Sequence, residues 1–175
     1  VIIFMDIDYR SIIWKIGRLH ILHRLHIHKA AAKNQLHFGQ LPILETIITN
    51  DNCSQRELAD KLQVSPPSIA TSIKRMQRIG LLEKIADEND MRYTHITITE
   101  KGKDLAEKCR IAFDEVDKQM FTGFNADECK QFYEYIERLI NNLSTDEYVG
   151  KDIRSLIAEV SEFDIKQKKE DIDCD

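Results

Sequence analysis

Apolar residues recur at every third or fourth position along most of this chain, with polar residues between them. That spacing matches the turn of an α-helix, so the pattern predicts amphipathic helices. The expected helices cover residues 8–28, 38–49, 54–62, 65–79, 99–120, 125–143 and 153–163. Two shorter segments, 81–86 and 93–97, have the pattern of strands instead, and the polar turn at 87–90 between them predicts a β-hairpin.

Capping residues mark several of the helix ends. Ser54 and Glu57 have the spacing of a capping box, in which the serine caps the helix and the glutamate reaches back. Ser65 followed by Pro66 predicts another serine-capped start, because proline at the first helical position loses no hydrogen bond. Gly80 is a typical residue to end that helix. Two later helices are expected to start after caps at Thr99 and Asn125.

The middle of the chain has the order short helix, turn, capped helix, hairpin. A short helix and a second helix joined by about three residues form a helix-turn-helix, and a hairpin after it forms a wing. The predicted fold is therefore mainly α with a small β-hairpin wing, a winged helix-turn-helix with long helices on either side of it. In such a motif the second helix enters the major groove of DNA.

That second helix is the candidate DNA-reading element. Its buried face is expected to be Ile69, Ile73 and Met76. Small hydroxyl side chains near its start allow close approach to base edges, and Arg75 can contact guanine or grip a phosphate. The expected DNA contacts on this helix are Ser65, Pro67, Ser68, Thr71, Ser72, Lys74, Arg75 and Arg78.

The hairpin tip supplies the remaining expected DNA contacts, Asp90 and Arg92. An arginine at this position can enter the narrow minor groove, where the potential is most negative. Asp90 is placed to pair with Arg92 and hold it outward. Asp87 and Glu88 are expected to form an ordinary solvated turn.

The charge distribution supports this interpretation even though the net charge is −5. Residues 143–175 hold ten acidic and five basic residues, so the excess of acid lies in the C-terminal part. Residues 65–82 contain Lys74, Arg75 and Arg78 and no acid. A basic surface of this local kind is what DNA binding requires.

Composition otherwise indicates an ordinary globular chain. Of its 175 residues, 42% are hydrophobic and 31% are charged, which fits one domain with an appendage. The four cysteines are scattered and form no C-x-x-C pair, and the apolar start is too short for a secretion signal. We therefore expect reduced thiols, a cytoplasmic location and a charged, frayed tail over residues 166–175.

Several ordered motifs together resemble one protein family. They are Gly39-Gln40-Leu41-Pro42-Ile43-Leu44, Ser54-Gln55-Arg56-Glu57-Leu58-Ala59, Ser65-Pro66-Pro67-Ser68-Ile69-Ala70 through Arg75 to Gly80-Leu81-Leu82, and Asp90-Met91-Arg92 with Ile98-Thr99-Glu100-Lys101-Gly102. In this order and spacing they resemble the MarR family of bacterial regulators, over roughly residues 10–143. Two features depart from the family pattern. Asn89 replaces a second wing arginine, and the helix at 151–165 lies beyond the usual end of the family.

The resemblance implies a homodimer that binds a pseudo-palindromic operator and commonly represses transcription until a small molecule releases it. It also implies an effector pocket between the dimer helices and the DNA-binding lobe, for which Trp14, His23, Phe38 and Phe113 are candidates. The expected division is an N-terminal dimerisation helix, the DNA-binding lobe, two dimerisation helices, and an additional amphipathic helix with an acidic tail. These cover residues 1–36, 37–98, 99–145 and 146–175.

His20, His23 and His26 lie one helical turn apart and allow three interpretations. They can bind zinc, as some members of this family do, act as a pH switch, or simply pack at the dimer interface or line the effector pocket. We favour packing, because a zinc site needs further converging ligands, and we expect no metal and no cofactor. The alternative functions are a zinc-responsive regulator and a winged-helix module that binds another protein. No catalytic motif points to an enzyme.

Overall fold

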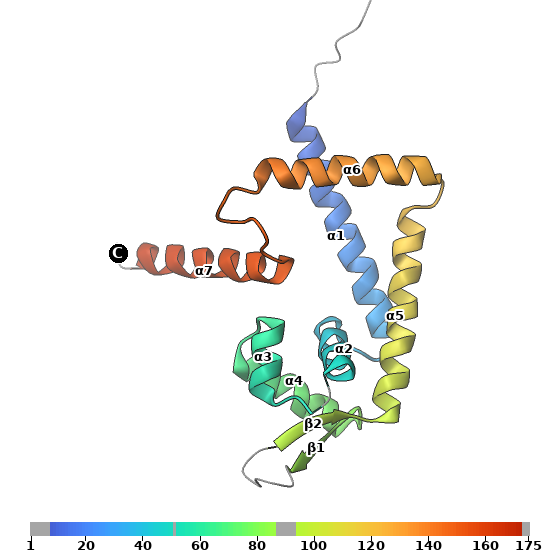
Figure 1. Cartoon of the computed structure of the whole chain (residues 1–175), viewed down its shortest axis with the longest axis vertical. Coiled ribbons are helices and arrows are strands. Elements are labelled where there is room, and N and C mark those ends of the chain that lie inside the picture. Colours follow the sequence, from blue (N-terminus) through green and yellow to red (C-terminus); the bar gives the residue numbers. More distant parts are fainter. Residues whose placement is uncertain (1–7, 51, 87–93, 173–175) are drawn as a thin grey trace, which may run out of the picture.

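The computed structural model of the chain describes residues 8–50, 52–86 and 94–172. Its helices and strands follow the sequence-based order closely (Figure 1). They are α1 (Tyr9–Lys33), the 3-10 helix η1 (Phe38–Gln40), α2 (Leu41–Thr49), α3 (Gln55–Leu62), α4 (Pro66–Arg78), β1 (Leu82–Ala86), β2 (Thr94–Ile98), α5 (Glu100–Met120), α6 (Ala126–Leu143) and α7 (Ile153–Ile172).

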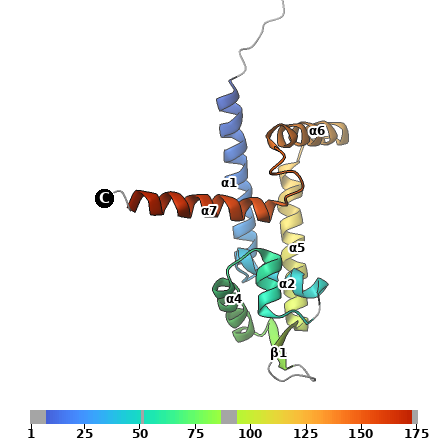
Figure 2. The ribbon, with the colours of Figure 1, turned by 60° about the vertical axis from the view of Figure 1, so that its left-hand side comes forward.

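The elements form a compact lobe with long helices leading away from it. Figure 1 shows α2, α3, α4 and the hairpin gathered at one end, while α1 and α5 run alongside each other away from that end. Turned by 60°, the view in Figure 2 shows α6 at the end of α5 farthest from the hairpin, with α7 projecting sideways. The predicted fold class, mainly α with a small hairpin, is confirmed.

One hydrophobic core lies inside the lobe. It combines side chains from α2, α3, α4, both strands and the first half of α5. Leu44, Ile47, Leu58, Ile73 and Met76 have no exposed surface. Burial of this kind stabilises by about 1.5–3 kcal/mol for each large apolar side chain, so this core holds the lobe together.

The hairpin pairs its two strands antiparallel over five residue pairs, from Leu82 opposite Ile98 to Ala86 opposite Thr94. A third segment joins them, because the N–H of Ile96 donates to the carbonyl of Cys53 at 3.0 Å. This bridge was not predicted from the sequence. It fixes the segment before α3 to the middle of β2.

Three of the four predicted caps are confirmed. The N–H of Glu57 donates to Ser54 Oγ at 3.2 Å, and the N–H of Ser54 donates to Glu57 Oε2 at 2.8 Å. Asn125 forms the same reciprocal box with Glu128, and Thr99 Oγ1 accepts from the N–H of Gly102 at 3.0 Å. The prediction was wrong for the side chain of Ser65. This residue occupies the cap position, but its hydroxyl lies 2.8 Å from the hydroxyl of Ser68 and makes no capping bond.

Three boundaries differ from the expectation. The first helix continues to Lys33 rather than ending near residue 28, because alanine favours helix and Ala30 and Ala31 are buried. Residues 38–49 divide into η1 and α2, because Pro42 lacks an N–H and is tolerated only in the first turn of an α-helix. The expectation of a frayed tail was wrong up to residue 172, where α7 ends.

Among the described residues, no helix combines the length and the apolar character needed to span a membrane.

Candidate nucleic-acid interface

A tight turn sets the angle between α3 and α4. Gln63 has φ of 51°, in the left-handed region, and the N–H of Val64 donates to the carbonyl of Ala59 at 3.1 Å. This is the bond of a Schellman motif, which ends a helix sharply and lets the chain change direction. The turn places α4 against α3 and the core, as a helix-turn-helix requires. Gln63 was not singled out from the sequence, because glutamine carries no turn signal.

The inner face of α4 is the one expected. Ile69 is 1% exposed, and Ile73 and Met76 are fully buried. They lie three or four residues apart, so all three project from one side of the helix. This packing fixes the rotation of α4 and leaves its other side to solvent.

The outer face of α4 gathers the polar residues predicted to contact DNA. Ser65, Pro67, Ser68, Thr71, Lys74, Arg75 and Arg78 are exposed, and Ser72 is partly buried. Thr71 Oγ1 donates to the carbonyl of Pro67 at 2.9 Å, so its hydroxyl hydrogen is already used and its oxygen is free to accept. Within the described residues, none of the three cations on this face has an ion-pair partner. The face therefore presents small hydroxyls first and, toward its C-terminal end, cations that no described residue neutralises.

The exit from α4 is held to the start of α5. The N–H of Leu81 donates to the carbonyl of Met76 at 2.9 Å, and Gly80 takes φ of 73°, which is unfavourable for residues with a Cβ. Lys101 Nζ donates to the carbonyl of Ile79 at 2.7 Å, an interaction that a helix C-terminus favours.

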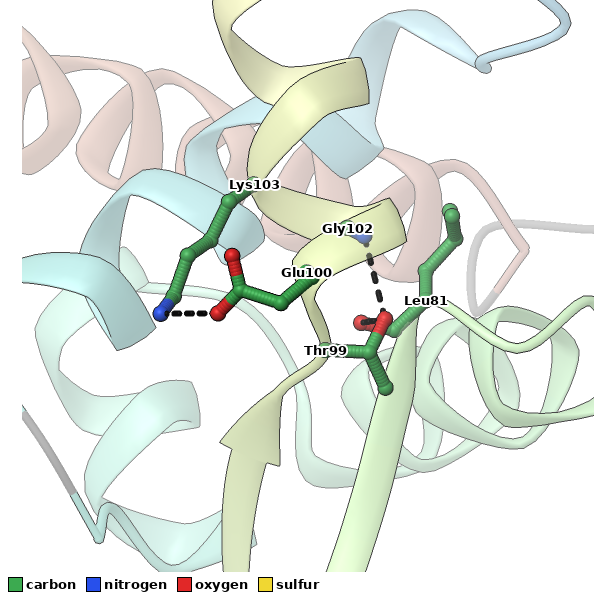
Figure 3. A network of polar contacts seen from close by, with 5 residues as sticks. All are labelled: Leu81, Thr99, Glu100, Gly102 and Lys103. Atoms are coloured by element: carbon green, nitrogen blue, oxygen red, sulfur yellow. Dashed lines mark hydrogen bonds and ion pairs between the residues drawn. The ribbon is translucent and has the colours of Figure 1, made fainter.

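Thr99 completes this junction (Figure 3). Figure 3 shows its hydroxyl accepting from the N–H of Gly102 and donating to the carbonyl of Leu81 at 3.2 Å. The same hydroxyl donates to the carbonyl of Gly80 at 2.8 Å, and the N–H of Thr99 donates to the carbonyl of Leu81 at 3.1 Å. One side chain thus links the end of α4, the end of β2 and the beginning of α5. These bonds fix the start of α5 to the end of α4 and to the hairpin.

Asp90 and Arg92, the expected wing contacts, lie outside the described residues, as does Asn89. The strands that lead to them are described, and β1 and β2 place the hairpin beside α4 and α2. The placement of the two wing residues against DNA stays a prediction.

Of the four residues proposed for an effector pocket, the three with described side chains do not line one common cavity. His23 lines a cavity of about 170 Å³ between α1 and α5, whereas Trp14 lies on a separate hollow of α1. Phe113 is partly buried and packs against the core. The side chain of Phe38 lies outside the described part of the structure.

One histidine of α1, His23, contacts α5. His23 Nε2 lies 2.7 Å from Asp117 Oδ1 of α5, with both side chains partly exposed. No group of three or more histidine, cysteine or acidic side chains suited to a metal occurs in the described ranges. Within the described part of one chain, His20, His23 and His26 therefore do not form a metal site together.

The electrostatics of the interface include one clear pKa shift. The N–H of Ser54 donates to the carboxylate of Glu57, and this hydrogen bond, with that to the Ser54 hydroxyl, lowers the pKa of Glu57 below its usual value. The charge of Glu57 is thereby retained at the N-terminus of α3, where it also complements the helix dipole.

Comparison with known proteins agrees with this geometry. Residues 36–94, which contain the helix-turn-helix and reach from α2 to the start of β2, match the sequence model of the MarR family. The chain is 26% identical over 156 residues to the HTH-type transcriptional regulator BilQ of Clostridioides difficile, with 89% of this chain and 98% of BilQ covered.

Solved structures share the fold. The YusO protein of Bacillus subtilis superimposes with a TM-score of 0.69 at 15% identity, covering 75% of this chain and 94% of YusO. A mutant of S. aureus MepR bound to an oligodeoxyribonucleotide gives a TM-score of 0.60 at 18% identity, covering 79% of this chain and all of MepR. The family match, the named relatives and the common fold agree with one another. Residues 36–94 thus match the MarR family, most of the chain is similar in sequence to an HTH-type transcriptional regulator, and the fold is the one found in YusO and MepR.

Proposed function

We propose that two copies of this chain form a homodimer that binds a pseudo-palindromic operator and represses transcription until a small molecule releases it. The observation that carries the proposal is the outer face of α4. Its small hydroxyl side chains are followed by Lys74, Arg75 and Arg78, all exposed and without a described ion-pair partner. Such a face suits a major groove, where hydroxyls and arginine contact base edges and lysine contacts phosphates.

The dimer is supported by helices whose apolar faces are left exposed by the described part of one chain. The helix α6 has 18 residues and a marked apolar face, yet none of its residues is buried. Along α1, Ile12, Ile16 and Leu19 are each 40–43% exposed. Exposed apolar surface of this extent is typical of protein interfaces, and a second copy of the chain would cover it. The dimerisation segments proposed are residues 1–36 and 99–145.

Release by a small molecule is supported by the position of the cavity that includes His23. It lies between α1 and α5, and α5 is joined through Thr99 to the end of α4. At about 170 Å³ the cavity in one chain is smaller than a typical ligand pocket of about 300–1,000 Å³. Helices of a second copy would enlarge or complete it. A ligand that moves α1 away from α5 would change the distance between the two copies of α4, the recognition helices of the dimer.

The proposal is tested by measuring mass and DNA binding on the same preparation. Light scattering is expected to give twice the chain mass. Fluorescence anisotropy with duplex DNA from upstream of the gene is expected to show tight binding that weakens steeply with salt. A shuffled duplex of equal length and composition is the control for sequence preference. A monomer, or equal affinity for both duplexes at all salt concentrations, would contradict the proposal.

A further inference from the structure

A cleft of about 500 Å³ lies at the C-terminal end of α4 and extends beyond the predicted DNA-binding residues of the helix-turn-helix. It forms where the C-terminal end of α1, the C-terminal end of α4 and the N-terminal half of α5 meet. Five cationic side chains and one carboxylate are among the residues that line it. They are Lys33 of α1, Arg75 and Arg78 of α4, Lys101 and Lys108 of α5, and Asp104 of α5.

Among the described residues, the acids near this cleft do not balance its positive charge. Within the described residues no ion pair joins Lys33, Arg75, Arg78 or Lys108 to a carboxylate. Lys101 donates to the carbonyl of Ile79, which satisfies a donor but leaves its charge in place. A concave surface with five cations and one acid concentrates positive potential, so its ligand must be an anion.

The cleft is continuous with the outer face of α4, because Arg75 and Arg78 belong to both. A duplex seated on α4 would bring its backbone past the opening of the cleft. The side chains are exposed, as contacts to phosphates on a passing strand require.

We propose that this cleft holds a backbone phosphate of the same duplex that α4 reads, with Lys33 and Lys108 as contacts outside the helix-turn-helix. The proposal rests on the DNA binding proposed above. Lys33 ends the helix that is proposed to form the dimer, so its contact ties the position of α1 to the DNA. A change in the distance or angle between α1 and α4 would then weaken the contact of Lys33 with the phosphate.

The test measures how affinity for the operator duplex depends on salt in the full-length protein. Lys33→Ala and Lys108→Ala each remove one cation that makes no described ion pair. Each lost phosphate contact lowers the slope of log affinity against log salt by about 0.9, hence by about 1.8 for a dimer. The affinity ratio of wild type to variant should then fall about tenfold between roughly 50 and 200 mM salt.

Two further variants make the test specific. Lys166→Ala, an equal charge change on α7 away from the cleft, should leave the slope unchanged. Asp104→Asn removes the one acid among the described residues that line the cleft and should increase affinity, because it ends the repulsion between that carboxylate and the phosphate. Thermal unfolding of each variant checks that the fold is retained.

The outcomes separate this proposal from the one on which it rests. If Arg75→Ala weakens operator binding while Lys33→Ala, Lys108→Ala and Asp104→Asn behave like wild type, the cleft proposal is overturned and the DNA-binding proposal stands. If wild type binds no duplex even at low salt, the proposed function fails first. A cleft that binds inorganic phosphate while its variants keep the wild-type salt slope is a small-anion site, which also overturns the proposal.

Discussion

Gly102 packs against the carbonyl group of Leu81 so closely that no side chain fits between them. A Cβ atom built on Gly102 would overlap the Leu81 oxygen and lie 2.7 Å from Ile98 Cγ1. The two residues belong to the start of α5 and to the link between α4 and β1, so their contact sets the distance between these elements (Figure 3). The neighbouring cap of Thr99 depends on the same close approach, since its hydroxyl accepts from the N–H of Gly102.

Gly102→Ala should therefore lower the free energy of unfolding by about 1–3 kcal/mol, the usual cost of forcing an extra carbon into a packed site. The obstacle is a backbone oxygen, which cannot move aside as a flexible side chain would. Urea denaturation followed by circular dichroism measures the effect. Gly39→Ala is the matched control, because a Cβ there meets nothing within 4 Å. Equal stability of the two variants would show that the junction is looser than the structure indicates.

Glu57 gives a pH dependence whose sign follows from its hydrogen bonds. The backbone N–H of Ser54 lowers the pKa of this carboxyl in the folded chain. A group whose pKa is lower when folded contributes stability above its unfolded pKa and loses it as the pH falls through the folded value. Glu57→Gln keeps a capping side chain but cannot ionise. The variant should be slightly less stable than wild type at pH 6, and the difference should be smaller at pH 3.

Urea denaturation at both pH values measures this difference. Glu134→Gln serves as the control, because Glu134 is exposed on α6 and takes part in no capping box. If the wild type and the Glu57→Gln variant lose stability in parallel on acidification, the ionised carboxylate of Glu57 in the capping box does not contribute to stability.

The sequence predicted the helix-turn-helix because its signals are local. The box of Ser54 and Glu57, the proline after Ser65 and the apolar period of Ile69, Ile73 and Met76 are each set by residues within one or two turns. These determine which side of α4 is buried, and hence which side is free for DNA. The side chains on the outer face of α4 could therefore be predicted from the sequence alone.

The features that escaped prediction are set by contacts between distant residues or by backbone strain. The bridge from Cys53 to Ile96 and the cleft that joins Lys33 to Lys108 bring together segments far apart in the chain. Gln63 adopts a left-handed conformation, which glutamine in a sequence does not predict. The helix start at Ser65 was predicted correctly, but its hydroxyl bonds to Ser68 because a neighbouring hydroxyl competes for it.

Gln63→Gly should stabilise the turn between α3 and α4. Glutamine at φ of 51° carries a steric cost that glycine does not, and this gain exceeds the entropy that glycine adds to the unfolded chain. We expect an increase in the free energy of unfolding of about 0.5 kcal/mol or more. Gln131→Gly, in the interior of α6, should instead lose about 1 kcal/mol. Destabilisation by both substitutions would mean that the Gln63 side chain, which donates to the carbonyl of Asp60, outweighs the strain.

The proposed dimer is tested on α6. Leu139 is 46% exposed and shares a face with Phe132, Ile136 and Leu143, so Leu139→Glu would place a charge in the interface. Charge burial without a partner costs several kcal/mol, and the variant should dissociate to monomers at micromolar concentration. Asn141→Glu adds the same charge on the opposite side of the helix and should stay dimeric. Sedimentation velocity measures both, and two dimeric variants would exclude this face of α6 from the interface.

Arg75 and Arg92 are expected to serve different parts of DNA recognition. Arg75 is exposed on the outer face of α4, which is proposed to read base edges, whereas Arg92 belongs to the wing and is proposed to enter the minor groove. Arg75→Ala should cost about 1–3 kcal/mol of operator affinity and less for a shuffled duplex, because the lost contact is to a base. Arg92→Ala should weaken binding to both duplexes and flatten its salt dependence, because the main contribution of Arg92 is electrostatic.

Anisotropy titrations on both duplexes at several salt concentrations separate the two effects, with Arg138→Ala on α6 as a control for the loss of positive charge. If Arg75→Ala reduced both affinities equally, its role would be a phosphate contact. If neither arginine changed affinity, the proposed docking of α4 and the wing on DNA would be wrong.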